Sequence, residues 1–301
     1  MAKKKVRFVV NPKSGGIFGA RFNRRMVERN LDLNKFDYDI FYTKFAGHAI
    51  KIVQQSLIER TDIIAVVGGD GTQNEVGQIL LNQSTILASI PTGSGNANAR
   101  KMQIPIDVEK SIQLINTGKI FKIDACILNG QPFFMTAGIG YDAKVVEQFN
   151  KIPVRGVGAY LGGVLSTAFS YQLADFHIEI DNQQVIDTKA FTVLITSTGQ
   201  LGYNVEFSHE SVINDGIFEI AIIKDFNRTK VPQLIYEAFW GDIAQQDFIE
   251  RHTVKDIVKI KTNKIESIQM DGDYKGKTNY IEVTCKKQAL NFLVAPDFNL
   301  K

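Results

Sequence analysis

The chain has 301 residues, of which 44% are hydrophobic and 22% are charged, and its formal net charge is +3. This length provides for two domains of ordinary size, and the composition excludes both a disordered chain and a protein that coats nucleic acid through its charge. The two cysteines, Cys126 and Cys285, lie far apart without a CxxC pattern. Their spacing favours free thiols in a reducing, cytoplasmic compartment.

The first part of the chain alternates short apolar runs with helical patterns, which is typical of βα units and a mostly parallel sheet. We therefore expect an N-terminal, doubly wound α/β domain over residues 1–122. Its strands are predicted at 6–10, 38–42, 63–67 and 86–90, and its helices near 21–30, 49–59, 73–81 and 108–117.

From residue 123 onward, strands follow strands. The apolar runs on either side of Asn129-Gly130 predict a hairpin with a two-residue turn. We expect a second, mainly antiparallel β-sandwich domain over 123–289, and a tail, 290–301, that could pack back onto the first domain. Further strands are predicted at 176–180, 190–196, 217–223, 256–261 and 280–284, with helices near 157–171 and 231–240.

Glycine-rich loops follow the first, third and fourth predicted strands. In an open α/β sheet the ligand binds beyond the carboxyl ends of the strands, and glycine lets backbone N–H groups come close to phosphate oxygens. A single loop of this kind is equally well explained as a tight turn, but three at one edge predict a phosphate cradle. Neither a P-loop nor a GxGxxG pattern is present. The loops are Asn11-Pro12-Lys13-Ser14-Gly15-Gly16, Gly68-Gly69-Asp70-Gly71-Thr72 and Pro91-Thr92-Gly93-Ser94-Gly95-Asn96.

Asp70 lies inside the second of these loops, between two glycines. A carboxylate beside phosphates makes chemical sense when a cation lies between them, so the position indicates Mg²⁺. The alternative is that Asp70 caps the helix predicted to begin near Gln73, although Thr72 already offers a hydroxyl for that purpose.

The three loops resemble the nucleotide-binding motifs of the diacylglycerol kinase and sphingoid-base kinase superfamily. Thr43 with Gly47-His48-Ala49 resembles the segment that follows the second strand in these enzymes. The resemblance implies a two-domain lipid kinase that transfers the γ-phosphate of ATP to a lipid hydroxyl, with its active site between the domains. It places ATP at Asn11, Ser14, Gly15, Gly16, Thr43, Gly68, Gly69, Asp70, Gly71, Thr72, Gln73, Asn74, Gly93, Ser94, Gly95 and Asn96.

In the second domain the resemblance continues at 137–143, 159–161, 214–216 and 271–273. It implies that Asp273 is the proton acceptor, with Asp70 as the second catalytic residue. It also implies a structural Mg²⁺ site formed by Asp215 and the carbonyl groups of Val212 and Ile217. The family usually has Asp-Gly-Glu where this chain has Asp-Gly-Asp, so the predicted base is about one methylene shorter. The segment 208–210 also departs from the usual pattern beside the Mg²⁺ motif.

The expected partners are ATP, Mg²⁺ and a lipid substrate, with transient contact to a membrane surface, no nucleic acid, and a homodimer left open. The lipid is either a diacylglycerol or a sphingoid base, because Ala97 after the third loop resembles the sphingoid-base kinases. The apolar stripe at 157–171 fits an acyl-chain cleft and a core helix equally well. Two alternatives remain: an NAD kinase-like enzyme, and a lipid- or nucleotide-binding module with weak catalysis.

Overall fold

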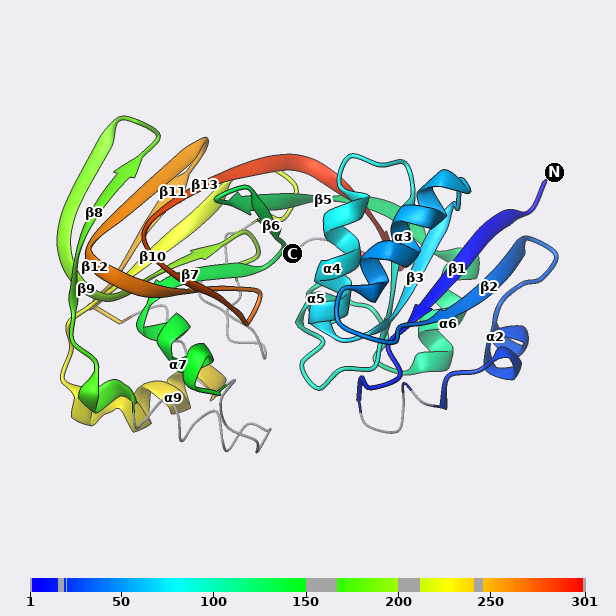
Figure 1. The fold of residues 1–301 in the computed structure, drawn as a ribbon, viewed down its shortest axis with the longest axis horizontal. Coiled ribbons are helices and arrows are strands. Elements are labelled where there is room, and N and C mark those ends of the chain that lie inside the picture. The colour runs from blue at the N-terminus through cyan, green and yellow to red at the C-terminus, as the bar shows by residue number, and fades with distance from the viewer. Residues whose placement is uncertain are drawn as a thin grey trace. The chain divides into compact units, whose positions relative to one another are not determined.

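The computed structural model describes residues 2–15, 19, 21–149, 167–199, 212–240 and 246–299, with only the backbone at 235 and 238–240. The chain forms two compact units, one of residues 1–125 with 288–301 and one of residues 126–287. The elements carry the labels of Figure 1.

The first unit is built on a parallel sheet with the strand order β4-β3-β1-β2. The chain passes from β1 outward to β2 and then returns to the other side of β1 for β3, so the order reverses between β1 and β3. In doubly wound sheets this reversal is where ligands bind. The strands are β1 (Lys4–Val10), β2 (Phe36–Tyr42), β3 (Ile63–Gly68) and β4 (Ile86–Pro91).

Helices cover both faces of this sheet. On β1, Phe8 lies in the apolar cluster that contains residues of α2 and α6, whereas the neighbouring Arg7 bonds to Ser56 of α3 and to Glu59 directly after it. Successive residues of a strand point to opposite faces, so α2 and α6 lie on one side of the sheet and α3, which packs against α4, lies on the other. The predicted doubly wound fold is confirmed. The helices are α2 (Arg24–Asn30), α3 (His48–Ile58), α4 (Asp70–Leu80), α5 (Ala97–Lys101) and α6 (Val108–Thr117).

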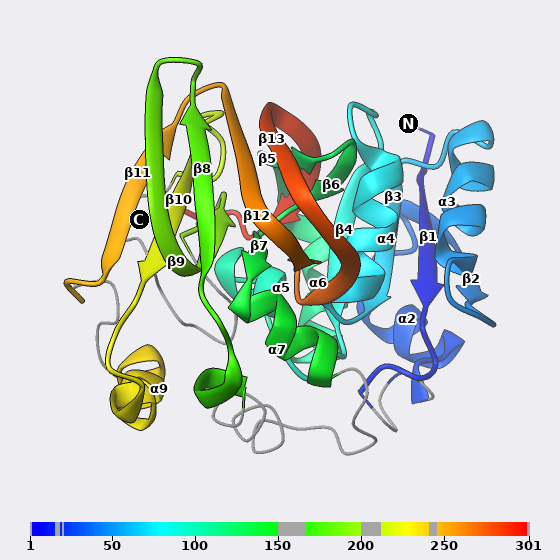
Figure 2. The ribbon, with the colours of Figure 1, turned by 60° about the vertical axis from the view of Figure 1, so that its left-hand side comes forward.

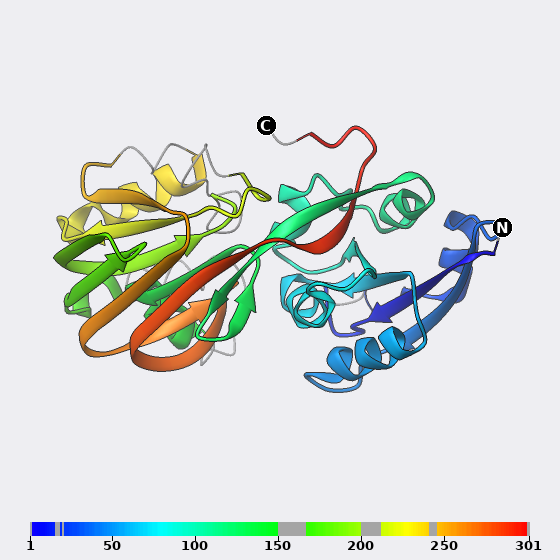
Figure 3. The same cartoon turned by 90° about the horizontal axis from the view of Figure 1, so that it is seen from above.

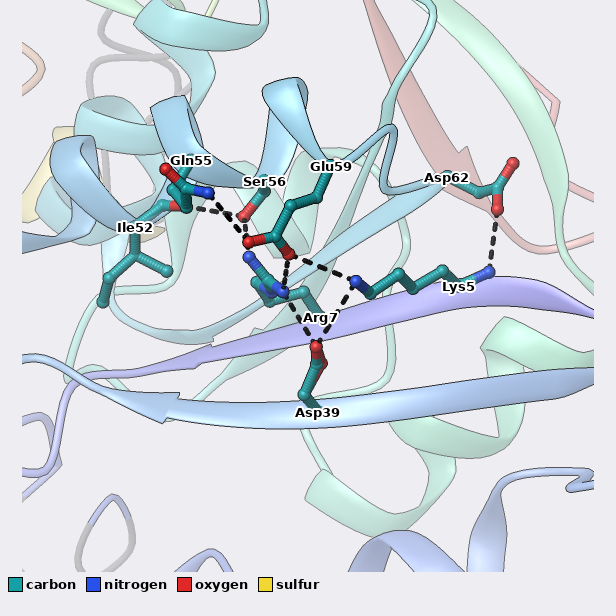
Figure 4. A network of polar contacts seen from close by, with 8 residues as sticks. All are labelled: Lys5, Arg7, Asp39, Ile52, Gln55, Ser56, Glu59 and Asp62. Carbon is teal, nitrogen blue, oxygen red and sulfur yellow. Dashed lines mark hydrogen bonds and ion pairs between the residues drawn. The ribbon is translucent and has the colours of Figure 1, made fainter.

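A buried guanidinium ties β1 to β2 and α3 (Figure 4). Arg7 donates to Ser56 Oγ at 3.1 Å, to Asp39 Oδ2 at 2.8 Å and to Glu59 Oε2 at 2.5 Å, and its own side chain is only 2% exposed. A buried cation needs such paired carboxylates, because leaving it unpaired would cost several kcal/mol. The network therefore fixes both β2 and α3 to β1.

This network makes the stability of the fold sensitive to acid. Hydrogen bonds from Gln55 first, and then from Arg7 and Lys5, lower the pKa of Glu59 to about 2. Because the ordinary glutamate pKa of about 4.3 is higher, Glu59 stabilises the fold above that value and loses its contribution as the pH falls toward about 2. We expect Glu59→Gln to lower the melting temperature at neutral pH, with a difference from wild type that shrinks over this range. A difference that stays constant down to about pH 2 would contradict this account.

The second unit is mainly antiparallel. Its hairpin turn has the predicted position, with both Asn129 (φ 46°) and Gly130 (φ 82°) in the left-handed region. The strands are β5 (Lys119–Leu128), β6 (Gln131–Phe133), β7 (Thr136–Gly140), β8 (Ala174–Ile180), β9 (Gln184–Thr196), β10 (Phe218–Lys224), β11 (Ile249–Val254), β12 (Ile257–Met270) and β13 (Asp273–Val294), and the helices are α7 (Tyr141–Phe149), the 3₁₀ turn η1 (Arg228–Lys230) and α9 (Val231–Trp240). Two of these strands continue into the first unit, since β5 begins there and β13 ends there.

Two long strands join the layers of this β-sandwich. Both β9 and β12 pair with β8 over one part of their length and with β7 over another. Figure 2 shows the β8–β9 hairpin beside β12, with α7 packed against β7 and β12. The inward-facing residues of these strands form one large apolar cluster, which confirms the predicted β-sandwich. The last strand, β13, runs alongside β5 (Figure 3), and its Phe292 pairs with Leu87 of β4.

Candidate nucleotide site and acceptor turn

The carboxyl ends of the four parallel strands lie in register at one edge of the first unit. Val10 is opposite both Tyr42 and Val67, and Gly68 is opposite Pro91. The three glycine-rich loops and the segment that begins at Thr43 therefore start at the same edge. Thr43 itself continues the ladder, because its N–H donates to the carbonyl of Val10 at 2.8 Å.

Asn11 connects the first loop to the start of α4. Its Nδ2 donates to Thr72 Oγ1 at 3.1 Å, and its Oδ1 accepts the N–H of Lys13 at 3.1 Å. Ser14 lies in the same place, since its Oγ would be 3.7 Å from a Cβ added to Gly69. The structure thus brings together residues of the first and second loops that are about sixty positions apart in the sequence.

The second and third loops approach each other through two glycines. A Cβ at Gly93 would lie 2.6 Å from the Cα of Gly69, and a Cβ at Gly69 would lie 3.1 Å from the Cα of Gly93. Asn96, in the left-handed region at φ 52°, closes the third loop. Its Oδ1 accepts the N–H of Gly93 at 2.9 Å, and its Nδ2 donates to the Gly93 carbonyl at 2.7 Å.

This close approach predicts that Gly93→Ala lowers ATP affinity by about tenfold or more, because the new methyl group forces two backbone segments apart. The matched comparison is Gly95→Ala, whose Cβ would meet only the end of the Asp70 side chain, at 3.1 Å. We expect a smaller loss there. Titration of both variants with ATP measures the two affinities, and equal, unchanged affinities would mean that the loops do not form a phosphate cradle.

Asp70 is the first residue of α4 and is half-buried between the second and third loops. Its Oδ1 accepts the N–H of Asn98 at 3.2 Å, and its Oδ2 faces Gly95. The N-cap residue of α4 is Gly69, so Asp70 does not occupy the capping position considered for it. Its carboxylate instead lies among the loops, where it can hold a cation against phosphate oxygens.

Several donors at this edge suit phosphate groups. The first N–H groups of a helix have no partner within the helix, and α4 begins inside the second loop. The hydroxyl of Thr92 is buried and has no hydrogen-bond partner in the part of the chain that the structure describes. The residues present therefore fit a nucleotide phosphate with a divalent cation at Asp70, and sequence analysis had not singled out Thr92 or Asn98.

Two predicted contact residues have side chains directed elsewhere. Gln73 is buried and its Nε2 donates to Ser89 Oγ of β4 at 2.8 Å, while Asn74 Oδ1 accepts from Gln78 one turn further along α4. Of the other predicted residues, Gly15, Gly71 and Ser94 are exposed on the loops. Gly16 and the segment 157–166 lie outside the described residues.

In the second unit, Asp273 begins β13 directly after a two-residue turn, Asp271-Gly272, whose residues have φ 48° and 80°. The Asp273 carboxyl is 60% exposed and forms a long ion pair with Lys275, at 3.5 Å. An accessible carboxylate of this kind is able to accept a proton from a bound substrate.

The predicted Mg²⁺ motif of the second unit forms a tight turn. Asp215 Oδ1 accepts the N–H of Ile217 at 2.9 Å, and Gly216 between them has φ 83°. Asp215 contributes a single carboxylate, and the described residues contain no cluster of three or more side chains suited to a metal ion. The donor set fits Mg²⁺ only if water supplies several ligands, as Mg²⁺ commonly requires. Among the described helices, none is both long and apolar enough to cross a membrane.

Comparisons with known proteins agree with both units. Two family models match the chain, "Diacylglycerol kinase catalytic domain" over residues 5–128 and "YegS C-terminal NAD kinase beta sandwich-like domain" over residues 136–294. A diacylglycerol kinase of Bacillus subtilis (strain 168) is 27% identical over 282 residues, which cover 91% of this chain and 91% of that protein.

Solved structures show the same fold. A diacylglycerol kinase from Bacillus anthracis str. Sterne superposes with a TM-score of 0.74 at 22% identity, covering 99% of this chain and all of that one. Yeast NADH kinase in complex with NADH superposes less closely, with a TM-score of 0.53 at 13% identity over 99% of this chain and 85% of that one. Because the two family models together span most of the chain, one of them more than half of it, the chain belongs to the diacylglycerol kinase family and combines its catalytic domain with a YegS-type C-terminal domain.

Proposed function

We propose that this protein is an ATP- and Mg²⁺-dependent lipid kinase that phosphorylates a lipid hydroxyl group, on a diacylglycerol or a sphingoid base. The observation that carries the proposal is the close approach of Gly69 and Gly93, with Asp70 between their loops. A lipid acceptor resides in a membrane, so the proposal includes transient contact with a membrane surface.

In the first unit the protein positions the nucleotide. The N–H groups at the start of α4 and the hydroxyl groups of Ser14, Thr72 and Thr92 donate to phosphate oxygens, and Asn11 holds the first loop against α4. Asp70 would hold Mg²⁺, which would supply positive charge to neutralise the phosphates. A second, structural Mg²⁺ would be held by Asp215 with the carbonyl oxygens of Val212 and Ile217.

The transfer needs no covalent enzyme intermediate. The oxygen of the lipid hydroxyl forms a bond to the γ-phosphorus, and the bond from that phosphorus to the β,γ-bridging oxygen breaks. The bridging oxygen keeps the electron pair and leaves as part of ADP. Asp273 accepts the hydroxyl proton and later releases it to water.

A second candidate is an NAD kinase-like activity, which the fold similarity to yeast NADH kinase and the Gly-Gly-Asp-Gly-Thr loop favour. The two activities differ only in the acceptor hydroxyl. The test is to incubate the purified protein with γ-labelled ATP, Mg²⁺ and one acceptor at a time: diacylglycerol, monoacylglycerol, a sphingoid base or NAD. We expect a labelled lipid. ATP binding with no labelled product from any of the four would favour a binding module instead.

A further inference from the structure

The turn that carries Asp273 joins β12 to β13, and the strand ladder that leads to it is irregular. Met270 pairs with Asp273 directly across the turn, but the register of the ladder shifts between Ser267 and Gln269. A shift of this kind disrupts a ladder locally and bends the strand. Residues 273–280 of β13 are all half-buried or exposed. The direction of the Asp273 carboxyl therefore depends on contacts made outside this ladder.

Asp271, the first residue of the turn, contacts the segment between the end of β6 and the start of β7. Its carboxylate accepts the N–H groups of Phe134, Met135 and Thr136, at 2.9, 2.9 and 3.1 Å. Oδ2 accepts the first of these and Oδ1 accepts the other two. The Asp271 N–H in turn donates to the Thr136 carbonyl at 2.7 Å. Bonds from N–H groups to a carboxylate are stronger than bonds between neutral groups, and we call these four contacts the Asp271 clamp.

The segment 134–136 is held from its other side by the end of β9. Ser197 donates through Oγ to the Phe134 carbonyl at 3.0 Å and through its N–H to the Met135 carbonyl at 3.1 Å. Thr196 Oγ1 also donates to the Met135 carbonyl, at 3.2 Å. The strand β9 pairs with β7, β8 and β10, so it lies inside the sheet. The Asp271 clamp thus ties the turn to a segment that is itself bonded to the interior of the second unit.

The same arrangement occurs at the turn between β8 and β9, which contains no proposed catalytic residue. Asp181 has φ 53°, close to the 48° of Asp271, and its carboxylate accepts the N–H groups of Lys255, Asp256 and Ile257 at 3.1, 2.9 and 3.1 Å. Its own N–H donates to the Ile257 carbonyl at 2.8 Å. These contacts lie at the first residue of β12, whereas Asp271 follows the last. Such a clamp can therefore serve stability alone, and what distinguishes Asp271 is its position two residues before Asp273.

We propose that Asp271 is a positioning residue, which directs the Asp273 carboxyl by fixing the turn to the segment 134–136. This role rests on the proposed function of Asp273 as the proton acceptor, whereas the clamp itself does not. Gln269 adds one bond at the middle of the turn, where its Oε1 accepts the Gly272 N–H at 3.0 Å. A reacting group that is misplaced by about 1 Å can cost about 10²-fold in rate. A loosened turn should therefore slow the chemical step.

The clamp is tested without any enzyme assay, by hydrogen exchange measured with NMR at the amide groups of Phe134, Met135 and Thr136. We expect all three to be protected in the wild type and to exchange about tenfold faster or more in Asp271→Asn. Asparagine suits the left-handed backbone of the turn, but it offers one oxygen instead of two, so its NH₂ group faces an N–H donor. Unprotected amides in the wild type would overturn the clamp.

The positioning role is tested by kinetics with the best acceptor. We expect Asp271→Asn to lower kcat about 10- to 100-fold and to leave the KM for ATP nearly unchanged. The matched control is Asp181→Asn, which weakens the same kind of clamp at the other end of β12. It should lower the melting temperature about as much, with turnover unchanged. Wild-type kcat in Asp271→Asn would overturn the role, as would an equal loss of kcat in Asp181→Asn.

A double variant shows whether Asp271 acts through Asp273. If it does, adding Asp271→Asn to Asp273→Asn should change kcat by no more than about twofold, because no carboxylate is left to position. Losses that multiply in the double variant would mean that Asp271 has a separate role, and would contradict the proposal.

The remaining outcomes separate this role from the proposed function. If Asp271→Asn does not fold, Asp271→Gly replaces it, since glycine adopts a positive φ freely. Failure of both to fold beside a folded Asp181→Asn would make Asp271 essential to the fold and overturn the positioning role. If the wild type phosphorylates no acceptor, or if Asp273→Asn keeps the wild-type rate, the proposed function of Asp273 fails and the positioning role with it, whereas the exchange result stands.

Discussion

Replacing Asp70 with asparagine should reduce γ-phosphate transfer by about 10²- to 10³-fold, the usual loss when one charge that stabilises the transition state is removed. Asparagine keeps the oxygen that accepts the Asn98 N–H, so the contact between α4 and α5 survives. Steady-state turnover measured beside a thermal melt separates loss of catalysis from loss of folding. Activity within a few fold of wild type would mean that Asp70 holds no catalytic cation.

A control is needed because Asp70 also lies in the first turn of a helix, where a negative charge contributes about 0.3 to 1 kcal/mol. Glu109 also lies in the first turn of its helix, α6, and belongs to none of the three loops. We expect Glu109→Gln to change the melting temperature about as much as Asp70→Asn does, with turnover unchanged. A similar loss of turnover in both variants would assign the effect of Asp70→Asn to the fold.

Asp273→Asn should lower kcat by about 10²- to 10⁴-fold, the contribution of a positioned general base, and leave the affinity for ATP nearly unchanged. Single-turnover transfer of labelled γ-phosphate to the best acceptor measures the chemical step directly. The wild-type rate in Asp273→Asn would show that Asp273 is only a turn residue and that the proton leaves by another route.

Glutamate at the same position is the informative conservative change. Asp273→Glu keeps the carboxylate and restores the longer side chain that the family usually has, so we expect it to retain activity. The matched control is Asp187→Asn, an exposed aspartate of the same unit that pairs with His177 at 2.7 Å. It should leave the transfer rate unchanged. An inactive Asp273→Glu with normal ATP binding would contradict the assignment of a proton-accepting carboxylate.

The elements that the sequence predicted well are those whose signals are local. The strands β1, β3 and β4 are mostly buried and appear as apolar runs, whereas β2 is half-exposed and alternates. The observed ends of all four differ from the predicted ones by two residues at most. Helix α6 was predicted with the bounds that it has, and Asp107 caps it by accepting the Lys110 N–H.

The elements that were missed depend on contacts that are distant in sequence. The helix α5 has only five residues and starts from Asn96 in a left-handed conformation, which no periodicity predicts. The helix α7 was read only as part of a motif, because it buries a glutamate, Glu147, among its apolar residues. The strand β13 was predicted only at 280–284, because its exposed first half alternates polar residues.

The candidate site was likewise predicted where its signals are local and missed where it depends on contacts between residues that are distant in sequence. Glycine content and position after a strand were enough to predict which loops gather at the sheet edge. Sequence spacing could not reveal that the Asn98 N–H meets Asp70, or that Asn96 closes its loop through both of its amide atoms. Near the Asp273 turn, Gln269 Nε2 donates to Asp142 Oδ2, and these residues are 127 positions apart and are brought together by the pairing of β7 with β12.

The most direct test of the proposed function is a competition between acceptors in one reaction. The purified protein is incubated with γ-labelled ATP, Mg²⁺, vesicles that contain diacylglycerol and a sphingoid base, and an equal concentration of NAD, and the labelled products are separated. We predict label in a lipid phosphate, none in NADP, and no label in either product with Asp70→Asn over the same time. Label in NADP without any labelled lipid would contradict the proposal and identify an NAD kinase-like enzyme.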